Sequence, residues 1–170
     1  MTASLTTRPG FGRALAAVRG AEIGLLRAVA LDIVAVGGPD ALGTLGAEAI
    51  SLIRAATGPT SVDLQAHSTA DGDATTFLGR AGRGVAVSAH LSVVAGESQQ
   101  PLRATIRLVG THGSVLVDLL RPLLDVRTVA GRTEVPFGAH GGDAPVPEAS
   151  DALSAIAESA RSGRTTTITW

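Results

Sequence analysis

The chain has 170 residues, of which 45% are hydrophobic, a formal net charge of −1 and no cysteine. These values predict one compact domain without disulfides, and the near-neutral charge and the scarcity of aromatic residues argue against a nucleic-acid partner. All 14 basic residues are arginine, which excludes Schiff-base chemistry and every other mechanism that needs a lysine.

The first ten residues carry one arginine and no apolar block of the kind found in secretory signals. We therefore interpret residues 1–10 as an N-terminal tail and residues 11–170 as a single domain, and we expect a cytoplasmic location. No apolar run reaches the roughly 18 residues that cross a bilayer, so we expect no membrane partner.

The first third of the chain predicts two helices on either side of a strand. Residues 11–20 have apolar side chains at helical spacing and end on Gly20, a residue favoured just past a helix. Residues 25–36 are mostly apolar and lead into a turn, which predicts a long, largely buried strand. Residues 40–56 return to a 3.6-residue period and predict the second helix.

The apolar period then changes to two, which predicts a series of strands. They comprise residues 61–68, 74–80, 84–94, 102–110, 114–120, 124–131 and 132–137. Their short links indicate a mainly antiparallel sheet. Residues 138–147 resemble a loop, residues 148–161 an amphipathic helix, and a short last strand follows. We predict an α+β fold: a largely antiparallel open β-sheet with helices packed on one face.

One face of this sheet has no helix to cover it. Along the central strands, every second residue is apolar, and this set, one parity of the strand positions, should face the helices. The other parity is polar or small and comprises Asp63, Gln65, His67, Ser88, His90, Ser92, Arg103, Thr105 and Arg107. We expect these residues to face water or a second subunit, and we predict a homodimer or larger homo-oligomer that forms through this face.

Several local strings occur in a characteristic order. Residues 11–36 run from a helix through the turn Gly20-Ala21-Glu22-Ile23-Gly24 into a long strand, and residues 102–118 hold a Gly-x-x-Gly turn between two strands. The closing helix is followed by Gly163-Arg164. Together these strings resemble the C-terminal domain of the Gfo/Idh/MocA family of oxidoreductases, a dihydrodipicolinate-reductase-like fold. The resemblance covers roughly residues 11–168.

In that family the C-terminal domain follows a Rossmann domain that binds NAD or NADP through a Gly-rich turn. This sequence has no Gly-x-Gly-x-x-Gly turn between a strand and a helix, and no lysine for the family's Glu-Lys-Pro motif. The resemblance therefore implies that this chain alone binds no cofactor, and that NAD(P) enters only if a separate Rossmann-domain protein supplies it.

The family's second motif, Asp-x-Gly-x-His-x-x-Asp, falls on residues 44–51 when the helix ends are aligned. Only Gly46 matches; Thr44, Glu48 and Ser51 replace the first Asp, the His and the last Asp. The spacing keeps these three on one helix face. The resemblance implies Glu48 as a candidate base and Thr44 and Ser51 as candidate substrate-binding residues; the alternative is that Glu48 is a solvated helix residue.

The remaining candidates lie on the polar parity of the sheet and in the loop. If their strands pair, His67 and His90 approach each other as an acid/base or metal cluster; a dimer contact is the alternative, and their spacing is not that of metal ligands. Arg103 and Arg107 are candidates to clasp a carboxylate or phosphate, with interface ion pairs as the alternative. His140 is a candidate to close over a pocket.

Three functions from different classes follow. The chain is a substrate-binding and oligomerisation subunit that completes an oxidoreductase together with a separate Rossmann-domain protein. Alternatively, it is a cofactor-free isomerase, lyase or cyclase that reuses the pocket with Glu48, His67 or His90 as acid/base. The third possibility is a non-catalytic scaffold or binder of a small molecule.

Overall fold

The computed structural model describes residues 4–58, 60–96, 101–121, 123–129, 131–136 and 150–169. The elements follow one another along the chain as η1 (Leu5–Thr7), α1 (Pro9–Arg19), β1 (Leu26–Val36), α2 (Pro39–Thr57), β2 (Val62–Ser68), β3 (Ala74–Ala81), β4 (Val85–Val94), β5 (Pro101–Gly110), β6 (Gly113–Asp118), β7 (Leu123–Thr128), β8 (Gly131–Pro136), α3 (Ser150–Ser162) and β9 (Thr166–Ile168). Trp170, the last residue of the sequence, lies outside the described residues.

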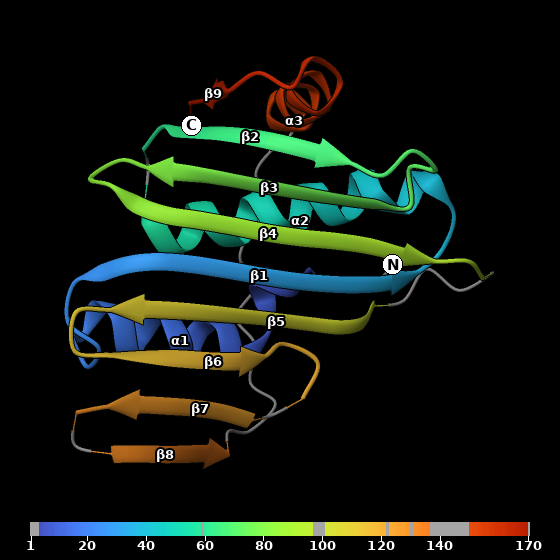
Figure 1. The fold of residues 1–170 in the computed structure, drawn as a ribbon. Coiled ribbons are helices and arrows are strands. Elements are labelled where there is room, and N and C mark those ends of the chain that lie inside the picture. The colour runs from blue at the N-terminus through green and yellow to red at the C-terminus, as the bar shows by residue number, and fades with distance from the viewer. Residues whose placement is uncertain are drawn as a thin grey trace.

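The strands form one nine-stranded sheet in the order β8-β7-β6-β5-β1-β4-β3-β2-β9 (Figure 1). Among the described strands, β1 and β4 are the one parallel pair; all other neighbours are antiparallel. After β1 the chain passes through α2 and the β2–β3 hairpin. β4 then runs beside β1 in the same direction, so this pair is parallel. The predicted α+β fold with a largely antiparallel open sheet is confirmed.

The helices lie on one side of the sheet, and the other side is uncovered (Figure 1). Along β1 the side chains of Val29, Leu31, Ile33 and Ala35 are buried, and the residues between them are partly exposed. The same alternation along β2, β4 and β5 buries the apolar parity beneath the helices and leaves the polar parity outside. We call the uncovered side the open face; the predicted division of the two parities is confirmed.

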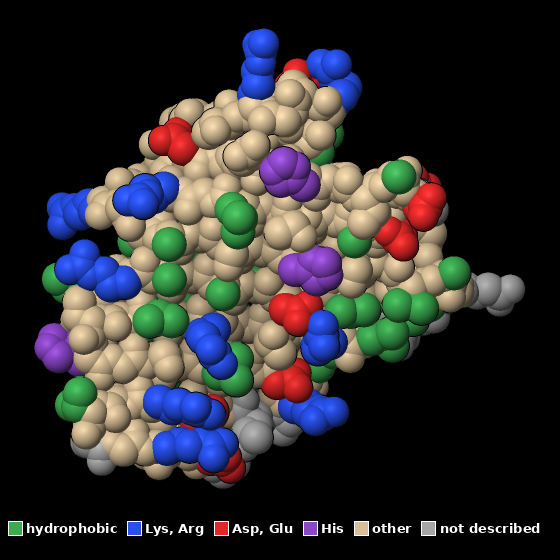
Figure 2. All heavy atoms as spheres, in the orientation of Figure 1, with side chains coloured by type: hydrophobic (Ala, Val, Ile, Leu, Met, Phe, Trp, Pro, Cys, Tyr) green, Lys and Arg blue, Asp and Glu red, His purple; other side chains and the backbone are tan. Residues whose placement is uncertain are grey.

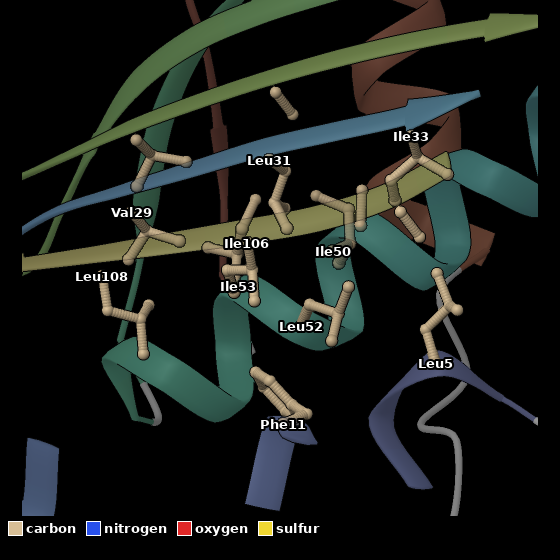
Figure 3. Close-up of a cluster of buried hydrophobic side chains, with 14 of the residues drawn as sticks. Leu5, Phe11, Val29, Leu31, Ile33, Ile50, Leu52, Ile53, Ile106 and Leu108 are labelled. Atoms are coloured by element: carbon tan, nitrogen blue, oxygen red, sulfur yellow. The ribbon is translucent and has the colours of Figure 1, made fainter. Parts of the chain in front are cut away.

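The core lies between the sheet and α2, and it continues beyond α2 (Figure 3). Ile53 lies near β1 and β5, whereas Phe11 of α1 and Leu5 of η1 lie on the far side of α2. Leu5 is buried, so residues 5–10 are not the free tail that we expected. One leucine among polar residues carries no periodic signal, and its burial depends on a groove that tertiary packing creates.

The Gly-x-x-Gly turn joins β5 to β6 as expected, and both glycines are needed for close approach. A Cβ on Gly110 would meet the carbonyl oxygen of Ile23, and one on Gly113 would meet that of Arg127. Both obstacles are backbone atoms that no rotamer change can move.

Among the described residues, no helix combines the length and the apolar character that crossing a membrane requires.

Candidate functional site

Glu48, the candidate base on α2, holds the N-terminal segment. Its Oε2 accepts hydrogen bonds from Ser4 Oγ at 2.8 Å and from the backbone N of Leu5 at 2.9 Å. The side chain is partly buried, and two donors already occupy one of its oxygens. Glu48 is therefore an anchor for η1, a role that differs from both a free base and a fully solvated residue.

The other α2 positions of the motif have different surroundings. Ser51 is buried, and its hydroxyl donates to the carbonyl oxygen of Ala47 at 2.9 Å, whereas Thr44 is exposed. Gly46, the one residue that matches the motif, lies against α3, where a Cβ would meet the side chain of Leu153. Helix packing is thus a sufficient reason for glycine at this position.

A cavity of about 410 Å³ lies between α2, α3 and strands β2 to β4. Its wall is mainly apolar, with Leu42, Leu153 and Ile156 among its residues. Its polar part includes the hydroxyl groups of Ser68 and Thr75, which are 2.8 Å apart and hydrogen-bonded to each other. The volume is typical of small-molecule sites, and no titratable side chain lines the cavity among the described residues. This arrangement suits binding rather than proton transfer.

On the open face, His67 and His90 are separated by strand β3. Both stand in register with Thr76, His67 from β2 and His90 from β4. Two strand spacings amount to about 9–10 Å. His90 Nδ1 is hydrogen-bonded to Thr76 Oγ1 at 2.9 Å. Within the described part of the chain, no three His, Asp or Glu residues form a group able to hold a metal ion.

Asp32 on β1 belongs to the same row of side chains, and sequence reasoning missed it. It stands in register between His90 of β4 and Thr105 of β5. Its Oδ2 pairs with Arg103 at 2.7 Å, while its Oδ1 is buried and has no hydrogen-bond partner among the described residues. Leaving such an oxygen unsatisfied costs about 1–3 kcal/mol. The available signal was one carboxylate within the otherwise apolar run of residues 28–36.

Arg103 and Arg107 do not form the predicted pair that would bind a carboxylate or phosphate together. Arg103 is committed to Asp32, whereas Arg107 is exposed beside Ala30 and Leu116 and makes no ion pair with any described residue. His140, the loop candidate, lies outside the described residues.

Toward the β8 edge, Asp125 is held by two arginines. Hydrogen bonds from Arg127 and then Arg132, at 3.0 and 3.1 Å, lower the pKa of this carboxyl below its ordinary value. On the described strands of the open face, acidic and basic residues are equally numerous: Asp32, Asp63, Asp118, Asp125 and Glu134 against Arg80, Arg103, Arg107, Arg127 and Arg132. Hydrophobic side chains lie among the charges (Figure 2). A balanced surface of this kind suits self-association better than a strongly charged partner.

No protein-family model and no curated protein matches the sequence. Solved structures do match. A protein assigned as an oxidoreductase from Thermotoga maritima has 21% identity and a TM-score of 0.78, with 97% of this chain and 62% of that chain covered. A levoglucosan dehydrogenase in complex with NADH and levoglucosan has 16% identity and a TM-score of 0.77, with 97% and 65% covered.

An NAD-binding oxidoreductase from Klebsiella pneumoniae has 15% identity and a TM-score of 0.75, with 99% of this chain and 65% of that chain covered. At this level of identity the likeness concerns the fold. The chain spans less than two thirds of the length of these proteins, and it shares the fold of the part of each that it covers.

Proposed function

We propose that this chain acts as the C-terminal, sheet-bearing subunit of a Gfo/Idh/MocA-type oxidoreductase assembly in the cytoplasm. In this role it binds a small molecule and brings subunits together, and a separate Rossmann-domain protein supplies NAD(P). The observation that carries the proposal is the one-sided match: nearly all of this chain aligns with only part of each NAD-binding or NADH-bound oxidoreductase.

The occupant proposed for the open face is a second copy of this chain. Ala28, Ala30 and Ser88 are small residues near its centre, so another sheet can approach closely. Leu78 on the same face is 58% exposed, and its burial would contribute favourably. The balanced charges of the open face offer complementary partners across a two-fold axis.

Light scattering on a variant of the open face tests this part of the proposal. Ala30 lies between Ser88 and Arg107, so Ala30→Arg adds bulk and a second positive charge at the centre. We expect a dimer or larger oligomer for the unmodified protein and a monomer for Ala30→Arg. Ala16→Arg, on the exposed side of α1, is the matched control and should keep the oligomer. A monomeric unmodified protein at micromolar concentration refutes the proposed interface.

The redox part is tested by affinity purification of the tagged chain, followed by NADH fluorescence titration. We expect no NADH binding by the chain alone, and binding by a complex that contains a Rossmann-domain protein. If the chain keeps its NADH binding and its activity after the Rossmann-domain protein is removed, the subunit proposal is refuted.

A cofactor-free enzyme is the second candidate, and the neighbouring Asp32 and His90 favour it. A carboxylate beside an imidazole is a common arrangement for general acid–base catalysis. On this alternative, His90→Ala abolishes turnover of the substrate while His67→Ala, two strands away from His90, does not. Unchanged turnover in both variants excludes a catalytic role for this pair.

A non-catalytic binder is the third candidate, and the apolar cavity between α2 and α3 favours it. Thermal-shift screening of small apolar alcohols and esters tests this function. Stabilisation that Leu153→Trp abolishes would support the cavity as the binding site, because the larger side chain fills it. Equal stabilisation of the unmodified protein and the variant would exclude it.

A further inference from the structure

We propose that a second cavity, at the start of β1, binds a small anion that carries an apolar body, either a carboxylate or a phosphate ester. The cavity has a volume of about 550 Å³. The start of β1, the end of α2 and the β3–β4 hairpin form it. Three elements that are distant in sequence therefore build its wall, and it is separate from the cavity between α2 and α3.

Two arginines without partners supply the charge. Arg27 and Arg83 both line the cavity, both are exposed, and neither side chain makes a hydrogen bond or ion pair with any described residue. No Asp or Glu is among the described lining residues. In Figure 2, arginine side chains gather at this end of the molecule, over the β3–β4 turn and the start of β1. Two unopposed guanidinium groups match the fork geometry of a carboxylate or phosphate.

The backbone beside each arginine departs from regular strand geometry. Arg83 is the central residue of a hairpin whose flanking Gly82 and Gly84 have φ of 39° and 88°. Both glycine amides are hydrogen-bonded at 3.0 Å, so the turn is tied at both ends. Arg27 lies at an irregularity in the pairing of β1 with β5, between Leu26 and Ala28. Such irregularities change the direction of a side chain and are frequent beside binding sites.

The remaining lining residues of the cavity indicate that the ligand has an apolar part. Leu26, Ala56 and Val85 give the cavity an apolar side, and Leu25, which is 70% exposed, stands at its rim. A ligand with one anionic group and a compact apolar part satisfies both sides of the cavity.

The test is an amide NMR titration of the ¹⁵N-labelled chain with phenyl phosphate, benzoate and the cation benzylammonium. We expect saturable shifts at Thr60, Gly82 and Gly84 with at least one anion, and none with benzylammonium. The tighter of the two anions identifies the ligand class. Arg27→Gln and Arg83→Gln should each weaken binding by about tenfold, since each removes one charged contact.

Arg19→Gln is the matched control, because Arg19 is also exposed and makes no ion pair with any described residue, but lies on α1. It should bind like the unmodified protein. The amide spectrum of each variant shows directly whether the fold is retained. Shifts that do not saturate, or equal binding by Arg27→Gln, Arg83→Gln and Arg19→Gln, would overturn the proposal.

Discussion

The anchoring role of Glu48 predicts a specific pattern of stability changes. Glu48→Ala removes the acceptor for both Ser4 Oγ and the Leu5 backbone N. Hydrogen bonds to a charged group contribute about 1.5–3 kcal/mol each when buried, and this carboxylate is only partly buried. We therefore expect a loss of about 2–3 kcal/mol in the free energy of unfolding and a fall in Tm of about 4–10 °C.

Glu48→Gln separates anchoring from catalysis. Its amide oxygen still accepts both hydrogen bonds, so we expect a loss of less than about 1 kcal/mol, whereas a catalytic base would be lost in either variant. Glu158→Ala serves as the control because Glu158 forms an exposed ion pair with Arg161, worth at most about 1 kcal/mol.

Urea denaturation measures the free energies of unfolding, and hydrogen exchange reports on the Leu5 amide. Exchange at Leu5 should accelerate in Glu48→Ala, since this amide loses its acceptor and η1 loosens from the core. The reasoning is refuted if Glu48→Ala unfolds at the same urea concentration as the unmodified protein and the Leu5 amide exchanges at an unchanged rate.

Three further predictions concern the sheet. Phe77 is fully buried, so Phe77→Ala should lower the free energy of unfolding, measured in urea, by about 3–5 kcal/mol. Leu78→Ala on the open face should lower it by far less. Gly110→Ala should cost about 1–3 kcal/mol because its Cβ meets a backbone carbonyl; a stability equal to that of the unmodified protein would contradict this. The lowered pKa of Asp125 stabilises the fold above the ordinary carboxyl pKa, and this contribution disappears as pH falls through the folded-state pKa. The urea midpoint of Asp125→Asn should therefore depend less on pH in the acid range than that of the unmodified protein. Parallel curves of midpoint against pH for the two proteins would contradict the role of this carboxyl.

Much of the local structure was accessible from the pattern of residues. The two-residue alternation along β4 placed Ser88 and His90 on the open face, and the structure leaves them there. The Gly-x-x-Gly string located the β5–β6 hairpin, because few residues other than glycine tolerate backbone approach on both sides. Side-chain period and turn chemistry are local properties, and a sequence carries them explicitly.

The partners of those residues were decided by the tertiary structure. Whether His90 meets His67 or Asp32 depends on strand order, and β3 separates the two histidines while β1 places Asp32 beside His90. Glu48 meets Leu5 because η1 folds back onto α2, 43 residues away. Such contacts depend on which elements pack together and in what register, and no local period encodes that choice. The sequence by itself thus determined the fold class and the two faces of the sheet, and tertiary packing determined which polar groups meet.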